Sequence, residues 1–235
     1  MENIERINCL INSLSKEERS VLKSNLSSKV PLFFDDENNL NVFDEKESSE
    51  FHFLAEVLHK LSPYHFDIPD NGIAYKGFPD WLTSSLVQEL QKEALLRRDK
   101  PLDRIDHFLG CGGKIADNLS TSNEVISFVE KHTGCIQPTG IASYLYYDEK
   151  GLGIKPHVDT DVFSINLMIM LNHEIDSNYI PSATLVFPKQ GTQESYRLAV
   201  GEVMIMYGGN VIHARSIIQE TEKVHLLTIG FNRIS

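Results

Sequence analysis

The sequence predicts an α+β protein in which helices come first and a set of antiparallel strands follows. Helical periodicity dominates the first half of the 235-residue chain. From Ile136 onward, runs rich in Val, Ile, Tyr, Phe and Thr alternate with turn residues, as antiparallel strands do. Short strands that follow a helical half indicate a β-barrel or double-sheet jelly roll buttressed by helices.

The first half contains several helical signals. Residues 1–26 predict a helical hairpin, in which Ser15 and Glu18 form a capping box for the second helix. Thr121 and Glu124 form a similar box for a later helix. The helices that follow the hairpin are expected over 51–61, 81–98 and 121–131. We interpret residues 1–62 as an N-terminal helical cap, whose hairpin either packs on the domain's own sheet or forms a homodimer contact.

The remaining segments divide into loops and strands. The acidic stretch 35–50 predicts a surface loop, and the glycine-dense stretch 110–114 predicts a turn. Residues 63–235 form the main domain, with a core over 138–232. Eight strands are expected near 140–147, 152–158, 162–171, 182–188, 195–200, 203–207, 210–216 and 223–232.

Charge and composition exclude several classes of partner. The formal net charge is −11, which argues against nucleic acid and anionic membrane surfaces, because both need a basic surface. The three cysteines form neither a disulfide framework nor a zinc motif. No signal peptide and no apolar run of membrane-spanning length is visible, so we expect a soluble cytoplasmic protein without nucleic-acid or membrane partners.

One short motif suggests metal chemistry. His157 and Asp159 are separated by one residue, and on an extended strand such residues point to the same side. His213 lies in a later strand-like run. Two His and one carboxylate on one face of a metal form the open site of non-haem Fe(II) oxygenases. Asp161 offers a second carboxylate on the same side, so a role in orienting a ligand is also open for it.

The C-terminal half resembles the Fe(II)/2-oxoglutarate-dependent dioxygenases, in particular their prolyl-hydroxylase-like branch. The likeness covers residues 138–232 and includes the His157-Val158-Asp159 motif, the distal His213 and the segment Ser182–Pro188. That segment departs from the family's Gly-Gly-x-Thr-x-Phe-Pro pattern, because Ser182 and Ala183 replace the two glycines. The resemblance implies a double-stranded β-helix of the jelly-roll or cupin type.

The resemblance also implies ligands and cofactors. His157, Asp159 and His213 would hold Fe(II), with 2-oxoglutarate as co-substrate, O2 as oxidant and ascorbate as a candidate reductant. Lys223 occupies the slot of the family's basic residue for the far carboxylate of 2-oxoglutarate, and Arg215, on the same strand face as His213, is the alternative.

Further co-substrate contacts are expected from uncharged side chains. The family's tyrosine corresponds to Tyr146, but the Tyr-to-Gly spacing departs from that of the family, so Tyr144 and Tyr147 are alternatives. Thr184 and Asn166 are the other candidates for lining the pocket.

The implied activity is hydroxylation of an unactivated C–H bond of a small molecule, with a free amino acid or an amino-acid-derived intermediate as the leading substrate class. A prolyl-type protein hydroxylase is the first alternative. A non-catalytic cupin-like module that binds a metal or small acid, and a zinc hydrolase, represent other classes. Desaturation and cyclisation also stay open.

Overall fold

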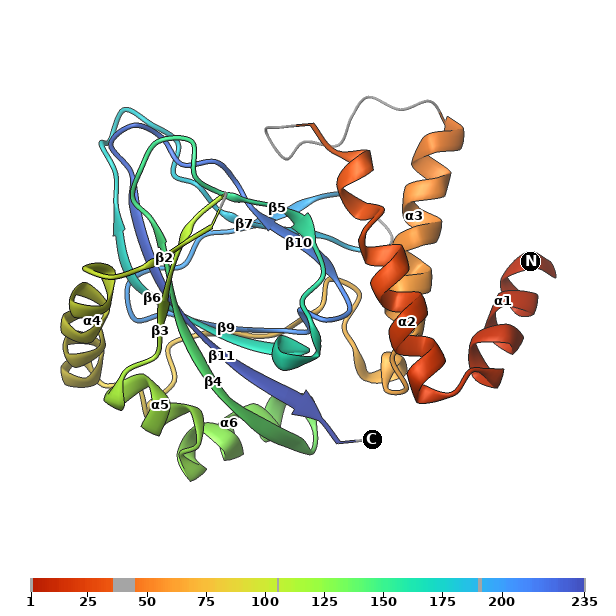
Figure 1. Cartoon of the computed structure of the whole chain (residues 1–235), viewed down its shortest axis with the longest axis horizontal. Helices are drawn as coiled ribbons and strands as arrows, with labels where there is room; N and C mark the ends of the chain where they lie inside the picture. The colour runs from red at the N-terminus through yellow and green to blue at the C-terminus, as the bar shows by residue number, and fades with distance from the viewer. Residues whose placement is uncertain (1, 36–44, 105, 190–191, 235) are drawn as a thin grey trace.

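The computed structural model describes residues 2–35, 45–104, 106–189 and 192–234. Its centre is a pair of antiparallel sheets that face each other (Figure 1). The larger sheet has the order β1-β9-β6-β11-β4-β3-β2, and the smaller one has the order β5-β10-β7-β8. The predicted double-sheet jelly roll is therefore confirmed.

The predicted strands lie near observed ones, with ends that differ by up to four residues, because most strands are short β-branched or aromatic runs between turn residues; β1, β2 and β3 were not among those predicted. All eight predicted strands are present. The larger sheet contains β1 (Ile73–Gly77), β2 (Leu102–Asp103), β3 (Phe108–Cys111), β4 (Ile136–Tyr147), β6 (Ile165–Glu174), β9 (Val203–Met206) and β11 (Lys223–Arg233). The smaller sheet contains β5 (Ile154–His157), β7 (Thr184–Phe187), β8 (Glu194–Tyr196) and β10 (Ile212–Arg215).

Helices cover the outside of both sheets. Figure 1 shows α4 (Ser84–Arg98), α5 (Lys114–Ser120) and α6 (Asn123–Thr133) against the larger sheet. On the other side lie α1 (Glu2–Ser13), α2 (Lys16–Ser27) and α3 (Glu45–Lys60). Short 3-10 turns complete the described helical content: η1 (Val30–Phe33), η2 (His65–Asp67) and η3 (Asp161–Phe163). No helix in the described ranges combines the length and apolarity that crossing a bilayer requires.

Three local predictions need correction, and one is confirmed. The capping box of Ser15 and Glu18 is present at the start of α2. In contrast, α6 is capped by Ser122, which accepts from the Val125 N–H, while Thr121 ends the preceding helix. The predicted loop 35–50 is helical from residue 45, and its part 36–44 lies outside the described residues. The predicted turn 110–114 instead joins the end of β3 to the start of α5.

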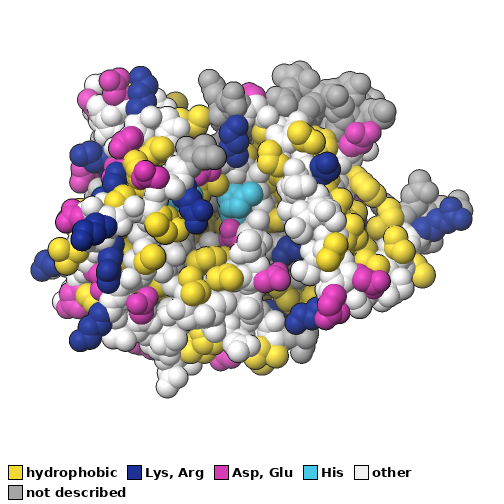
Figure 2. All heavy atoms as spheres, in the orientation of Figure 1, with side chains coloured by type: hydrophobic (Ala, Val, Ile, Leu, Met, Phe, Trp, Pro, Cys, Tyr) yellow, Lys and Arg dark blue, Asp and Glu magenta, His cyan; other side chains and the backbone are white. Residues whose placement is uncertain are grey.

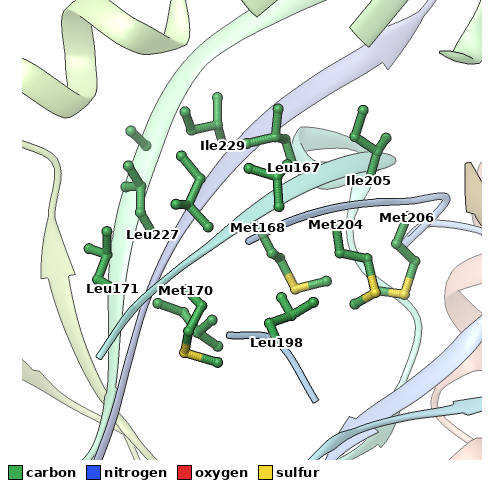
Figure 3. Packing of buried hydrophobic residues seen from close by; sticks show 14 of the residues in the cluster. Leu167, Met168, Met170, Leu171, Leu198, Met204, Ile205, Met206, Leu227 and Ile229 are labelled. Atoms are coloured by element: carbon green, nitrogen blue, oxygen red, sulfur yellow. The ribbon is translucent and has the colours of Figure 1, made fainter. Parts of the chain in front are cut away.

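The main core lies between the larger sheet and its helices and extends into the barrel. Its central side chains come from β6, β9 and β11, and Figure 3 shows Leu167, Met168, Met204, Ile205 and Ile229 packed together. Methionine is flexible enough to fill irregular gaps between strands. This rigid interior fixes the strands that carry the candidate site.

A second cluster joins the N-terminal cap to the smaller sheet. Phe187 on β7 contacts Phe34, with ring centroids 4.6 Å apart, and Phe51 on α3 packs edge-on against Phe34 at 5.5 Å. Ile212 and Ala214 of β10 belong to the same cluster. Because side chains alternate across a strand, residues 213 and 215 face the barrel interior. The homodimer contact expected of the cap stays a prediction.

Candidate metal and co-substrate site

The structure brings His157, Asp159 and His213 together at one end of the smaller sheet. One ligand-type atom from each side chain lies within 4.8 Å of the others. His157 ends β5 and pairs directly with His213 on β10, while Asp159 follows two residues beyond His157. In Figure 2 histidine side chains are visible near the middle of the face, bordered by acidic and basic side chains.

Each histidine presents Nε2 to this cluster, because its other ring nitrogen is engaged by the backbone. Nδ1 of His157 lies 2.7 Å from the carbonyl oxygen of Lys155, and Nδ1 of His213 lies 2.9 Å from that of Val211. A carbonyl oxygen only accepts hydrogen bonds, so Nδ1 carries the proton in both neutral rings. The lone pair is thus on Nε2, the arrangement that metal-binding histidines adopt.

The two oxygens of the Asp159 carboxylate have different partners, one facing the histidines and the other Asn166. Its Oδ1 lies 3.5 Å from Nε2 of His157 and 3.6 Å from Nε2 of His213. Its Oδ2 accepts a 3.0 Å hydrogen bond from Nδ2 of Asn166. Burial by itself raises the pKa of Asp159, but the two imidazoles, in their protonated form, hold that pKa well below its usual range. The Asp159 carboxylate is therefore ionised and held in a fixed orientation.

These residues fit a divalent metal ion such as Fe(II). Two neutral imidazoles and one carboxylate are the donor set of the facial triad. Because the backbone engages Nδ1 of each histidine and Asn166 engages Oδ2 of Asp159, one atom of each residue, Nε2 or Oδ1, is left for the ion. In the described ranges this is the one group of three His, Cys, Asp or Glu side chains with such spacing. A glycine at 208 is needed here, since a Cβ would lie 2.2 Å from Oδ2 of Asp159.

A cavity extends from the triad between the two sheets. Its walls are mainly apolar, with hydroxyl, amide and guanidinium groups at a few points. The lining residues are Leu145, Tyr147, Ile154, His157, Asp159, Asn166, Met168, Thr184, His213, Ala214, Arg215, Leu226 and Thr228. Thr184 and Asn166, both predicted pocket residues, are thus in this wall, where Asn166 holds Asp159.

Arg215 places a buried cation in the cavity wall. Its residue exposure is 4 %, and its Nη2 donates a 2.6 Å hydrogen bond to Oγ of Ser182. The guanidinium carbon lies 5.8 Å from the ring centroid of Tyr147. Burial lowers the pKa of Arg215, but a guanidinium stays protonated in proteins. Arg215 lies two positions after His213 on β10, so their backbone positions are about 7 Å apart along the strand.

Lys223 does not contribute to this cavity, contrary to the preferred assignment from the sequence. It is the exposed first residue of β11, opposite Glu174 on β6. The residues of β11 that line the cavity are Leu226 and Thr228. These have the opposite parity along the strand, so their side chains point to the other face.

Strand parity also decides between the tyrosines. Tyr146 points away from the cavity, and its hydroxyl donates a 2.7 Å hydrogen bond to the carbonyl oxygen of Ala94 on α4. Tyr144 has the same orientation and donates to Oε1 of Glu93 at 2.7 Å. Tyr147 lies on the opposite face and lines the cavity. Of the three tyrosines considered, Tyr147 is therefore the one in the cavity wall.

One charged group near the triad, Lys23, was not revealed by the sequence, and its charge interacts with that of Asp159. Asp161 is on η3 rather than beside the triad, and its Oδ1 lies 3.7 Å from Nζ of Lys23 on α2. The Lys23 side chain is only 17 % exposed. The sequence around Lys23 does not predict its contact with Asp161, because the contact depends on how the N-terminal helices pack against the main domain.

Comparisons with known proteins give the fold. No family model and no curated protein sequence matches the chain. Among solved structures, the non-haem α-ketoglutarate-dependent epimerase SnoN from nogalamycin biosynthesis has a TM-score of 0.55 at 11 % identity, covering 70 % of this chain and 79 % of that one.

Two further structures are similar. The Pseudomonas putida prolyl-4-hydroxylase has a TM-score of 0.53 at 15 % identity, covering 69 % of this chain and 94 % of its own. HygX from Streptomyces hygroscopicus, solved with nickel, 2-oxoglutarate and hygromycin B bound, has a TM-score of 0.54 at 11 % identity. The match covers 72 % of this chain and 85 % of the HygX chain. The chain therefore has the fold of the Fe(II)/2-oxoglutarate oxygenases, and a candidate His-x-Asp…His triad lies within it.

Proposed function

We propose that this protein is an Fe(II)- and 2-oxoglutarate-dependent oxygenase that hydroxylates an unactivated C–H bond. The observation that carries this proposal is the pairing, on one strand face, of His213 from an open-faced triad with the buried cation Arg215. A keto acid with a second, distant carboxylate needs a metal at one end and a cation at the other. A simple metal-binding module would need no such cation.

Several residues of the cavity have a role in this proposal. His157, Asp159 and His213 hold Fe(II), and Arg215 binds the far carboxylate of 2-oxoglutarate, with Thr184 and Tyr147 as neighbouring hydroxyl groups. Fe(II), 2-oxoglutarate and O2 together supply the oxidising power that converts C–H to C–OH, with succinate and CO2 as the other products.

The apolar walls serve the same reaction. Leu145, Met168 and Leu226 line the cavity that also contains the triad and Arg215, and in this proposal they keep bulk water away from the reacting groups. Ascorbate remains a candidate reductant for metal that is oxidised without turnover.

For the substrate we propose a small molecule, with a free amino acid or an amino-acid-derived intermediate as the leading class. Lys23 and Asp161 support this, because this cation and anion lie near Asp159 of the triad and match in sign the carboxylate and ammonium of an amino acid. Lys23 comes from the N-terminal helices, so residues 1–62 would act as a cap that selects the substrate for the domain of residues 63–235.

An anaerobic titration tests the activity class. Purified apoprotein is loaded with Fe(II), 2-oxoglutarate is added, and the visible charge-transfer band of a chelated keto acid is recorded. We expect the band in the wild type and in His132→Ala, whose histidine lies on α6 outside the cavity, and no band in His213→Ala. The absence of a band from folded, iron-loaded wild type would rule out the proposed function.

Product analysis then separates the substrate classes. Oxygen-dependent release of succinate, stimulated by a free amino acid that gains one oxygen by mass spectrometry, supports the leading class. Stimulation only by proline-containing peptides would favour a prolyl-type protein hydroxylase, and metal-dependent hydrolysis without O2 would favour a zinc hydrolase.

A further inference from the structure

A completely buried carboxylate lies behind Arg215. The side chain of Glu222 has no exposed surface. Its Oε1 accepts hydrogen bonds from the backbone N–H and the hydroxyl of Ser182, at 2.7 and 2.6 Å, and lies 2.8 Å from Nε2 of His173. Its Oε2 accepts from the Gln219 N–H at 3.1 Å. A carboxylate with this many partners is held in a single orientation.

Ser182 links this carboxylate to the cavity. Its Oγ donates to Glu222 and accepts from Nη2 of Arg215, with both distances at 2.6 Å. A hydroxyl has one proton, so the direction of both hydrogen bonds is fixed once the guanidinium donates. The three side chains form one chain of hydrogen bonds in which a buried negative charge is connected to a buried positive charge through a single hydroxyl.

The position of Ser182 in the sequence suggests a function for these hydrogen bonds between Arg215, Ser182 and Glu222. Ser182 stands where the family pattern has a glycine, which has no hydroxyl to offer, and Lys223, at the family's basic position, is exposed. Both departures concern the same function, since the buried cation here comes from β10 instead of β11. A serine that orients Arg215 is what such a relocated cation requires.

We propose that Ser182 and Glu222 are positioning residues that hold Arg215 as the receptor for the far carboxylate of 2-oxoglutarate. The inference rests on the proposed function and deepens it. The other explanation is that the network only stabilises the turn before β7. The two explanations differ in one respect: only a receptor role makes the network's effect depend on whether the bound keto acid has a far carboxylate.

The experiment therefore compares two keto acids on the Fe(II)-loaded protein without oxygen. 2-Oxoglutarate has the far carboxylate, and 2-oxopentanoate has a methyl group in its place, so both chelate the metal in the same way. The dissociation constant of each is read from the charge-transfer band. Thermal unfolding and Fe(II) binding of every variant are measured beside it to show that the fold and the triad are intact.

We expect Ser182→Ala to weaken 2-oxoglutarate binding about tenfold, the usual effect of losing a hydrogen bond to a charged group, and to leave 2-oxopentanoate binding within about twofold of the wild type. Glu222→Gln should act in the same direction, and Ser182→Thr, which retains the hydroxyl, should retain affinity. Ser182→Thr keeps the test usable if Glu222→Gln does not fold.

Matched controls come from the same region. Ser216→Ala removes a serine whose Oγ accepts from the Ala183 N–H, and Lys223→Ala removes the exposed lysine. Both should leave the two dissociation constants unchanged. The proposal is overturned if Ser182→Ala weakens both keto acids equally or neither, or if Lys223→Ala selectively weakens 2-oxoglutarate. Failure of the proposed function looks different, because wild type would then show no band with either keto acid.

Discussion

His157 and His213 lie directly opposite each other on the antiparallel strands β5 and β10, with their ring centroids 4.4 Å apart. Directly opposed residues of an antiparallel pair share a face, so the ladder between these strands sets the distance between the two imidazoles. A slip of one residue would turn one histidine to the outer face. The geometry of the candidate triad therefore depends on strand register more than on the loops around it.

Gly208→Ala should reduce metal affinity. The added Cβ would lie 2.2 Å from Oδ2 of Asp159, so the carboxylate must move. We expect at least a tenfold loss of affinity for Co(II) or Fe(II), measured by titration of the apoprotein. Gly140→Ala is the control: it strains the backbone, where φ is +71°, but has open space around the Cβ. Unchanged metal affinity in Gly208→Ala would show that Asp159 is not a ligand in this geometry.

Asn166→Ala should weaken metal binding through the orientation of Asp159. Nδ2 of Asn166 holds Oδ2 of that carboxylate at 3.0 Å. Loss of such an orienting partner typically costs 10- to 100-fold in metal affinity. Asn71→Ala removes an asparagine that instead contacts Glu194 and Tyr196, and should have no effect on the metal titration. Equal affinities in the two variants would contradict the role of Asn166.

Lys23→Ala should affect the substrate and spare the co-substrate. Nζ of Lys23 lies 3.7 Å from Oδ1 of Asp161, and its charge also interacts with that of Asp159, so under the proposed function its loss removes a charged contact for an anionic substrate group. For the free amino acid that best stimulates succinate release, we expect KM to rise about tenfold or more. The 2-oxoglutarate band should be unchanged. Lys16→Ala, an exposed residue on the same helix, serves as control, and an unaltered KM in Lys23→Ala would refute the contact.

Glu93→Gln should make the free energy of unfolding less dependent on pH in the acidic range. The carboxylate of Glu93 on α4 accepts hydrogen bonds from the Ile115 and Ala116 N–H groups, which are the first-turn donors of α5, and from the hydroxyl of Tyr144. Burial raises the pKa of Glu93, but these hydrogen bonds outweigh it and the pKa falls below its ordinary value of 4.5. The stabilisation is therefore complete above about pH 4.5 and is lost as the pH falls through the lowered pKa.

Urea unfolding at several pH values measures this effect. At pH 7 we expect Glu93→Gln to be about 1–3 kcal/mol less stable than wild type, with the difference shrinking toward pH 3. Glu89→Gln, an exposed substitution on the same helix, should follow the wild-type pH curve. A constant difference between Glu93→Gln and wild type at all pH values would show that the charge of Glu93 does not matter.

Features with a short-range cause could be predicted from the sequence. The box of Ser15 and Glu18 was found because both partners lie within one helical turn. The strands were found because each is an apolar run between turn residues. The box assigned to Thr121 was wrong because Ser122, the next residue, has the same capping chemistry, and one residue of sequence cannot decide between them. Glu93 caps α5 from another helix, which no local pattern shows.

For the candidate site, the sequence by itself determined the donor types and their order: His157, Asp159 and a distant His213. Only the tertiary structure decided which cation and which tyrosine face the cavity. The alternation of side chains along each strand turns Lys223 and Tyr146 outward and Arg215 and Tyr147 inward. Which residues of a strand face inward is set by the register in which the strand pairs with its neighbours. Ligand chemistry is thus a property of residue types, whereas the direction of a side chain is fixed by hydrogen bonds between strands far apart in sequence.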